Sequence, residues 1–145
     1  MIAITQSPIN LQEVVASVVM PETGGINVFV GTTRNHSHGR AVTVLEYEAY
    51  EPMALKMMNE IVEQARQTWE IQKVSMVHRV GTVPIGESSV VIAVSAAHRD
   101  EAFKACRFLI DELKRVVPIW KREYFADGTV EWSHHAHQQL AEDRH

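Results

Sequence analysis

The sequence has little that would indicate a secreted, membrane-bound or nucleic-acid-binding protein. Only one of its 145 residues is cysteine, so no internal disulfide can form, which fits a reducing compartment. No apolar run approaches the roughly 20 residues of a membrane span, and the N-terminus lacks the basic start and long apolar core of a signal peptide. The chain has 18 acidic and 14 basic residues, which gives a formal net charge of −4. It therefore has no global positive field that would attract nucleic acid. The sequence therefore predicts a cytoplasmic protein whose anion sites are local.

The composition is typical of one soluble globular domain. Apolar residues make up 46% of the chain and charged residues 22%, enough for a core without disulfides or a structural metal. The length is close to that of a single domain, and no linker or internal repeat interrupts the pattern. We expect one domain over residues 1–133, followed by a polar tail over residues 134–145.

Hydrophobic periodicity predicts an alternation of strands and helices. Strands are predicted over residues 2–5, 25–32, 41–50, 71–80, 88–97, 119–125 and 129–132, and helices over residues 9–20, 52–69 and 99–117. Strands 25–32 and 41–50 are expected to pair as a hairpin, with the polar loop 33–40 at its tip. Asp127-Gly128 predicts a second hairpin turn. Because helices alternate with hairpins, we expect an α+β fold with a largely antiparallel or mixed sheet and three main helices.

The last predicted helix carries its basic residues in two groups. At about 100° per residue, Lys104 and Arg115 fall on the solvent face, whereas Lys114 borders the apolar stripe. Pro118 ends the helix, and the strand that follows can bring Lys121 back to the same cavity as Lys114. A lysine near a low-dielectric pocket or other cations has a lowered pKa and can act as a base or nucleophile. Structural or solvated lysines remain the alternative interpretation.

Two other positions are candidate anion contacts. His98-Arg99 lies where a strand turns into a helix, and amides at a helix N-terminus beside a guanidinium suit a phosphate or carboxylate. A surface arginine next to a capping histidine is the alternative. Arg34, in the loop after a strand, is the second candidate, although a solvated arginine would explain the position equally well.

The remaining histidines and the cysteine indicate no metal site. Histidines stand at positions 36, 38, 134, 135 and 137, but their spacing matches no closed zinc pattern. Cys106 falls on the apolar face of its helix, where we expect a buried, inert thiol. The glycines between Gly81 and Gly86 resemble neither a P-loop nor a dinucleotide-binding loop.

Five segments, in order along the chain, together form a specific pattern. They are FVGTTRNHSHGR (29–40), LEYEAYEPMA (45–54), HRVGTVPIGE (78–87), VSAAHRDEAF (94–103) and IDELKRVVPIWKRE (110–123). On these segments the chain resembles the large, catalytic subunit family of molybdopterin synthase over nearly its whole length. The last dozen residues carry no clear family signal.

The resemblance implies an α+β fold of the hammerhead type and a homodimer that binds a small ubiquitin-like subunit at each end, giving a heterotetramer. The small subunit's C-terminal Gly-Gly thiocarboxylate enters a pocket of the large subunit. Two sulfurs pass in successive steps onto cyclic pyranopterin monophosphate, yielding molybdopterin, the dithiolene ligand of the molybdenum cofactor. The implied activity is that of a sulfurtransferase, with no metal or other cofactor at this step.

Carried over residue by residue, the resemblance implies a set of site residues. The substrate-binding residues would be Thr32, Thr33, Arg34, His98, Arg99, Lys114, Lys121, Arg122 and Glu123. Lys114 and Lys121 would also be catalytic, with Lys121 near the thiocarboxylate and Lys114 near the pterin. Thr33 stands where the family usually has a small aliphatic residue, a departure that leaves the role of Arg34 intact.

These residue types suit two anionic substrates. As a hypothesis, Lys121 holds the thiocarboxylate or assists proton transfer, and Lys114 does acid–base work at the pterin. Arg34 with His98 and Arg99 would fix the phosphate. Two alternatives remain open: another pterin or phosphoester enzyme that needs no protein sulfur donor, and a non-catalytic module that captures a partner's C-terminal carboxylate.

Overall fold

The structure, a computed structural model, describes residues 1–134 as three helices and nine strands. In chain order they are β1 (Ile2–Thr5), α1 (Leu11–Ala16), β2 (Gly25–Thr32), β3 (His36–Ser37), β4 (Arg40–Ala49), α2 (Glu51–Thr68), β5 (Val74–Arg79), β6 (Gly81–Pro84), β7 (Ser88–Ala96), α3 (Arg99–Val116), β8 (Ile119–Phe125) and β9 (Val130–His134). The α+β fold class with three helices is confirmed. The expected single domain over residues 1–133 stays a prediction.

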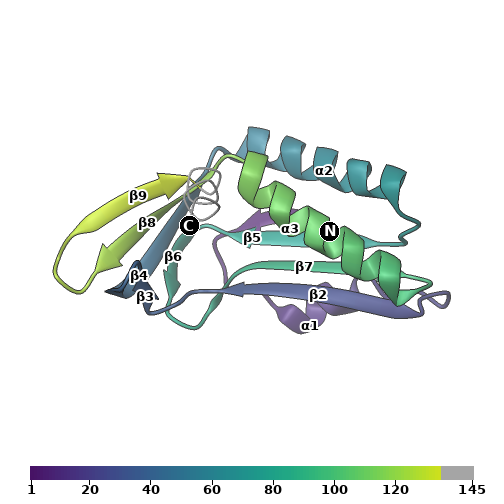
Figure 1. The fold of residues 1–145 in the computed structure, drawn as a ribbon, viewed down its shortest axis with the longest axis horizontal. Coiled ribbons are helices and arrows are strands. Elements are labelled where there is room, and N and C mark those ends of the chain that lie inside the picture. The colour runs from purple at the N-terminus through teal and green to yellow at the C-terminus, as the bar shows by residue number, and fades with distance from the viewer. Residues whose placement is uncertain (135–145) are drawn as a thin grey trace.

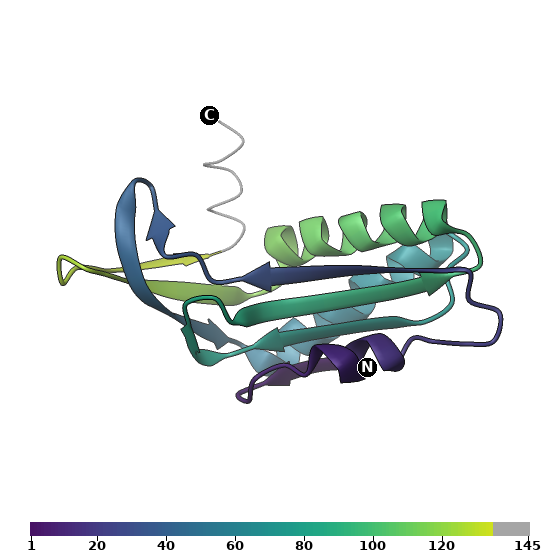
Figure 2. The same ribbon diagram turned by 90° about the horizontal axis from the view of Figure 1, so that it is seen from below.

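The first sheet has the strand order β1-β5-β7-β2, so β5 and β7 are its interior strands. Strands β1 and β5 are parallel, and the other pairs are antiparallel. Helices α2 and α3 lie side by side on one face, and the short α1 lies on the other (Figures 1 and 2). Because both faces are covered, β7 is buried at every position from 89 to 96 instead of alternating.

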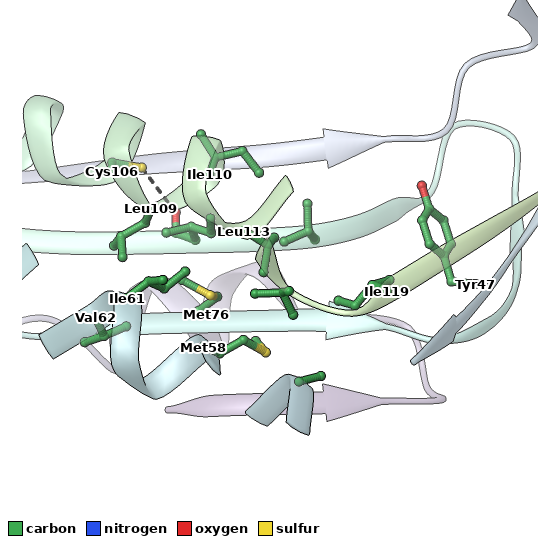
Figure 3. Packing of buried hydrophobic residues seen from close by; sticks show 14 of the residues in the cluster. Tyr47, Met58, Ile61, Val62, Met76, Cys106, Leu109, Ile110, Leu113 and Ile119 are labelled. Carbon is green, nitrogen blue, oxygen red and sulfur yellow. Dashed lines mark hydrogen bonds between the residues drawn. The ribbon is translucent and has the colours of Figure 1, made fainter. Parts of the chain in front are cut away.

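The main core fills the space between this sheet and helices α2 and α3, and it continues onto strands β4, β6 and β8 (Figure 3). Met58 of α2, Met76 of β5 and Leu109 of α3 are fully buried there. Complete burial of one such side chain stabilises the fold by about 1.5–3 kcal/mol. A smaller cluster on the opposite face packs Val14 and Val18 against the sheet.

The second sheet has the order β3-β4-β8-β9, with β6 also paired to β4. Its β8–β9 hairpin extends away from the helices (Figure 1). The expected hairpin of strands 25–32 and 41–50 is wrong: β2 pairs with β7 in the first sheet, whereas β4 pairs with β6 and β8 in the second. The physical reason is a tight turn inside the polar loop. His38 and Gly39 have φ values of 52° and 74°, which lets β3 fold back onto β4.

Other boundaries also differ from the sequence prediction. The helix expected over residues 9–20 is confined to Leu11–Ala16, because the Asn10 side chain accepts a hydrogen bond from the Glu13 amide and caps it there. The region expected as a turn, 81–87, contains strand β6. Within residues 1–134, no helix is long and apolar enough to cross a membrane. The predicted polar tail lies outside the described residues, apart from the His134 backbone, which ends β9.

Candidate active site

A pocket of about 320 Å³ lies where the two sheets meet the C-terminal end of α3. This volume is typical of small-molecule sites, which span roughly 300–1,000 Å³. The lining residues are Phe29, Gly31, Thr32, Arg34, His36, Ser37, Leu45, Tyr47, Ser89, Val90, Ile110, Lys114, Lys121 and Glu123. They come from both sheets and from α3, so the pocket depends on tertiary structure and on no single motif.

Three cationic side chains reach this pocket from three different parts of the chain. Arg34 lies two residues after the end of β2, Lys114 lies in the last turn of α3, and Lys121 lies in β8. In a protein with a net charge of −4, this convergence concentrates positive charge at one place. Arg and Lys side chains together suit phosphate and carboxylate groups. The pocket therefore has the charge of an anion-binding site.

Helix α3 directs Lys114 into the pocket through its packing. Ile110 and Leu113 are buried, and Lys114 is half-buried next to them, one turn after Ile110. The predicted solvent face is confirmed, since Lys104 and Arg115 have side-chain exposures of 58% and 65%. Both pair with acidic neighbours on the helix surface. The sequence pattern thus separated the pocket lysine from the surface cations.

Strand pairing places Lys121 and Glu123 on the pocket side of the second sheet. In the antiparallel register of β4 and β8, Tyr47 lies opposite Lys121 and Leu45 lies opposite Glu123. All four side chains line the pocket. This shared face follows from strand alternation, because Lys121 and Glu123 are two residues apart in β8.

Tyr47 joins the pocket wall to the core behind it. Its ring is buried and makes an edge-to-face contact with the buried His78, with centroids 5.1 Å apart. It lies at the opposite end of the drawn core from Val62 (Figure 3). Burial raises the pKa of the Tyr47 hydroxyl, a hydrogen bond with Ser89 lowers it, and the charge of Glu123 raises it further. Tyr47 thus presents a neutral hydroxyl group at physiological pH.

Some of the predicted site residues do not reach this pocket within one chain. His98 caps α3 at its far end, 16 residues before Lys114, which corresponds to about 24 Å of helix. Arg99, next to it, is exposed. Arg122 points to the outer face of β8, where its guanidinium stacks on Trp132 at 4.2 Å and pairs with Glu46 at 3.6 Å.

The threonines before Arg34 differ from each other. Thr32 is exposed and lines the pocket. Thr33 is buried at 3% exposure and is not among the lining residues. Its backbone exchanges hydrogen bonds with the loop before β7, since the Thr33 amide donates to Glu87 and the Thr33 carbonyl accepts from Gly86. Thr33 therefore fixes the strand end that carries Arg34.

Several lining residues were missed from the sequence. His36, interpreted there as a loop histidine, lies at the pocket, with Nδ1 3.1 Å from Oδ1 of Asn35. Ser37 and Ser89 are buried polar residues of the same wall. For Tyr47 the alternation of β4 is a usable signal, because it places Tyr47 on the same face as Leu45. The positions of Ser37 and Ser89 at the pocket depend on how strands that are distant in the sequence pair with each other.

Cys106 is buried, and burial raises the pKa of its thiol to about 11. This agrees with the expected inert thiol, because a thiolate is the nucleophilic form. Among residues 1–134 no group of three or more His, Cys, Asp or Glu side chains could hold a metal ion. The histidines 135 and 137 lie outside the described residues.

Comparison with known proteins gives one consistent result. The family model described as "MoaE protein" matches residues 4–116. Molybdopterin synthase catalytic subunit 1 of Aedes aegypti is 49% identical over 126 residues, which cover 86% of this chain and 81% of the relative. Molybdopterin synthase from Staphylococcus aureus has a similar structure, with a TM-score of 0.85 and 35% identity over 90% of this chain and 94% of that one. A protein–protein complex of subunits 1 and 2 of molybdopterin-converting factor from Helicobacter pylori shares the fold, with a TM-score of 0.74 and 21% identity over 92% and 88% of the two chains.

Proposed function

The chain belongs to the MoaE protein family, and from this we propose that it is the catalytic subunit of a molybdopterin synthase. It would act as a sulfurtransferase in molybdenum cofactor biosynthesis, moving sulfur from a small subunit's C-terminal thiocarboxylate to cyclic pyranopterin monophosphate. The observation that carries the proposal is the convergence of Arg34, Lys114 and Lys121 on one pocket in an acidic protein.

The pocket chemistry supports this activity in two ways. The thiocarboxylate and the cyclic phosphate are both anions, so a pocket with three cations lowers the free energy of holding them together. When sulfur attacks a side-chain carbon of the pterin, the ring oxygen of the phosphate leaves with negative charge. A protonated lysine near that oxygen stabilises the leaving group or gives it a proton.

The roles proposed for individual residues follow their positions. Lys121, on the strand face of the pocket, would hold the thiocarboxylate or assist proton transfer. Lys114, half-buried beside Ile110, would act as acid or base at the pterin. Arg34, which is exposed next to the pocket, would contact the phosphate.

A different explanation is needed for how His98, Arg99 and Arg122 could bind the substrate. His98 and Arg99 lie at the far end of α3, so they contact a substrate in this pocket only if a second copy of the chain supplies them. The homodimer implied by the resemblance would provide that copy. Arg122 lies on the outer face, where it would act by holding the β8–β9 hairpin through Trp132.

The partner proposed for this chain is the small subunit of the same enzyme, and the H. pylori complex of two subunits supports it by analogy of fold. With the homodimer this gives the heterotetramer expected from the resemblance. A cytoplasmic location is part of the same proposal.

The decisive experiment combines the purified protein with a thiocarboxylated small subunit and cyclic pyranopterin monophosphate, and measures dithiolene product. Replacing Lys121 with Ala should lower the rate by at least about a hundred-fold, the usual loss for a general acid–base group. Lys104→Ala is the matched control, because Lys104 is an exposed lysine of α3 and should keep the full rate. Near-normal product from a folded Lys121→Ala variant would refute the role of Lys121. Absence of product from the unaltered chain would refute the function.

A further inference from the structure

The Arg34 side chain reaches the pocket without support from other side chains. Arg34 lies in the segment between β2 and β3 and is exposed, and within residues 1–134 its guanidinium makes no hydrogen bond or ion pair. Ordering a loose segment when a ligand binds costs free energy. An arginine of this kind therefore binds an anion well only if the backbone that carries it is already fixed.

Both neighbours of Arg34 are tied by backbone hydrogen bonds. The Asn35 carbonyl accepts from the Val42 amide of β4 at 2.9 Å. On the other side, the Thr33 amide donates to the Glu87 carbonyl at 3.1 Å. Glu87 lies in the short loop between β6 and β7. The backbone position of Arg34 is therefore set by β4 on one side and by Glu87 on the other.

The side chain of Glu87 is tied in turn to a buried cation. Its Oε1 accepts a hydrogen bond from Nη1 of Arg79 at 2.8 Å. Arg79 belongs to β5, an interior strand of the first sheet, and its side chain is 9% exposed, whereas that of Glu87 is 45% exposed. Among residues 1–134, Glu87 is the only carboxylate that pairs with Arg79. Because ion pairs add little net stability, the main effect of this one is to fix Glu87 to a rigid strand.

We propose that the ion pair of Arg79 and Glu87 positions Arg34 for anion binding. Arg79 holds the Glu87 side chain, and the Glu87 carbonyl holds the Thr33 amide. Thr33 then fixes the backbone from which the Arg34 side chain reaches the pocket. Neither member of the pair lines the pocket, so both are positioning residues that act through Arg34. This inference rests on the proposed function, because it takes Arg34 as a contact of the substrate's phosphate.

Charge alone predicts the opposite effect for Glu87. It is an acidic residue close to a site for anions, so removing its charge should strengthen anion binding if only electrostatics acted. Loss of the tether should weaken binding instead, because the ligand must then order the segment that carries Arg34. The direction of the change in affinity thus separates the two explanations.

The test measures the binding of inorganic pyrophosphate by isothermal titration calorimetry. Glu87→Ala should weaken binding about three- to tenfold, since a displaced Arg34 makes a poorer contact. Glu87→Gln should keep at least about half of the affinity, because its amide oxygen still accepts from Arg79. In the Arg34→Ala background, Glu87→Ala should have no further effect. Glu112→Ala is the matched control, since Glu112 forms an ion pair of the same length, 2.8 Å, with Arg115 and should keep the affinity.

A second variant covers the risk that Glu87→Ala does not fold. Removing only the carboxylate leaves the buried Arg79 guanidinium unpaired, which is costly. The double variant Arg79→Met/Glu87→Ala removes both charges together and lacks the same tether. It should weaken pyrophosphate binding as Glu87→Ala does, and urea unfolding confirms that it is folded.

The outcomes separate this inference from the proposed function. Unchanged or tighter pyrophosphate binding by folded Glu87→Ala would overturn the inference, as would an equal further loss in the Arg34→Ala background or no binding by the unaltered chain. In the dithiolene assay, Glu87→Ala should raise the KM for cyclic pyranopterin monophosphate and leave kcat nearly unchanged. A lower kcat at an unchanged KM would overturn the inference, while the synthase function would stand. Pyrophosphate binding that depends on Glu87 through Arg34, without dithiolene product from the unaltered chain, would support the inference and refute the function.

Discussion

The buried His78 predicts a specific loss of stability in mild acid. Its ring is fully buried in β5 behind Tyr47, and burial lowers its pKa to about 4. Its Nδ1 lies 2.8 Å from the backbone carbonyl oxygen of Arg79, which can only accept, so the neutral ring carries its proton on Nδ1. In the unfolded chain the same side chain titrates near its ordinary value of about 6.5.

The direction of the effect follows from these two pKa values. Between pH values of about 6.5 and 4 the unfolded chain binds a proton at His78 that the folded chain does not, so acid favours unfolding. The free energy of unfolding should fall by about 2 kcal/mol from about pH 7 to about pH 5, and by about 3 kcal/mol once the folded pKa is passed.

The assay is urea unfolding at a series of pH values, with His78→Asn as the control. The asparagine amide can donate to the Arg79 carbonyl in place of Nδ1 but does not titrate in this range. The unaltered chain should lose about 2 kcal/mol more than the variant over the same pH interval. If the two losses agree within about 0.5 kcal/mol, the protonation of His78 does not control acid stability and the reasoning is refuted.

Two further predictions concern the core. Leu109→Ala removes a fully buried side chain between α3 and the first sheet and should lower the free energy of unfolding by about 2–5 kcal/mol. The control Leu11→Ala, at a residue that is 44% exposed, should lower it by less than about 1 kcal/mol. Equal effects of the two substitutions in urea unfolding would contradict the described packing. Cys106 should resist alkylation by iodoacetamide in the folded protein and react only after unfolding, because its thiol is buried and its pKa is about 11. Rapid labelling under native conditions, followed by mass spectrometry, would contradict this.

Most of the elements could be predicted from the sequence because their signals are local. Strand β7 is marked by a continuous run of small and β-branched residues, and the end of α3 by Pro118. The pairing of strands could not be predicted in the same way, since it depends on residues far apart in the chain. The loop between β2 and β4 looked like a hairpin tip, and only the backbone turn at His38 and Gly39 shows that the chain changes sheets there.

Alternation along a strand also fails where the pairing is irregular. A strict period of two places Val42 and Leu45 on opposite faces of β4, yet both are buried. The register with β8 shifts between Val42 and Val44, so one residue is left out of the alternation. Such a shift has no clear mark in the sequence, because Thr43 is an ordinary strand residue.

Local geometry and the family resemblance identified different residues of the candidate site. Helical periodicity and the break at Pro118 placed Lys114 and Lys121 near one cavity, and both line the pocket. Arg34 was already a candidate anion contact from its position in the loop after a strand, and the resemblance assigned it to the substrate. It also grouped His98 with these residues, although the structure separates them by the length of α3. A resemblance in sequence groups residues without showing how far apart the fold places them.

The position of the pocket between the two sheets links ligand binding to folding. A ligand that contacts Arg34, Lys114 and Lys121 touches the segment after the first sheet, the end of α3 and the second sheet at the same time. Opening the β8–β9 hairpin would then require release of the ligand. Saturation at about 100 times the dissociation constant adds about 2.7 kcal/mol to the free energy of that opening. The local stability of the hairpin that extends from the body therefore depends on whether the site is occupied.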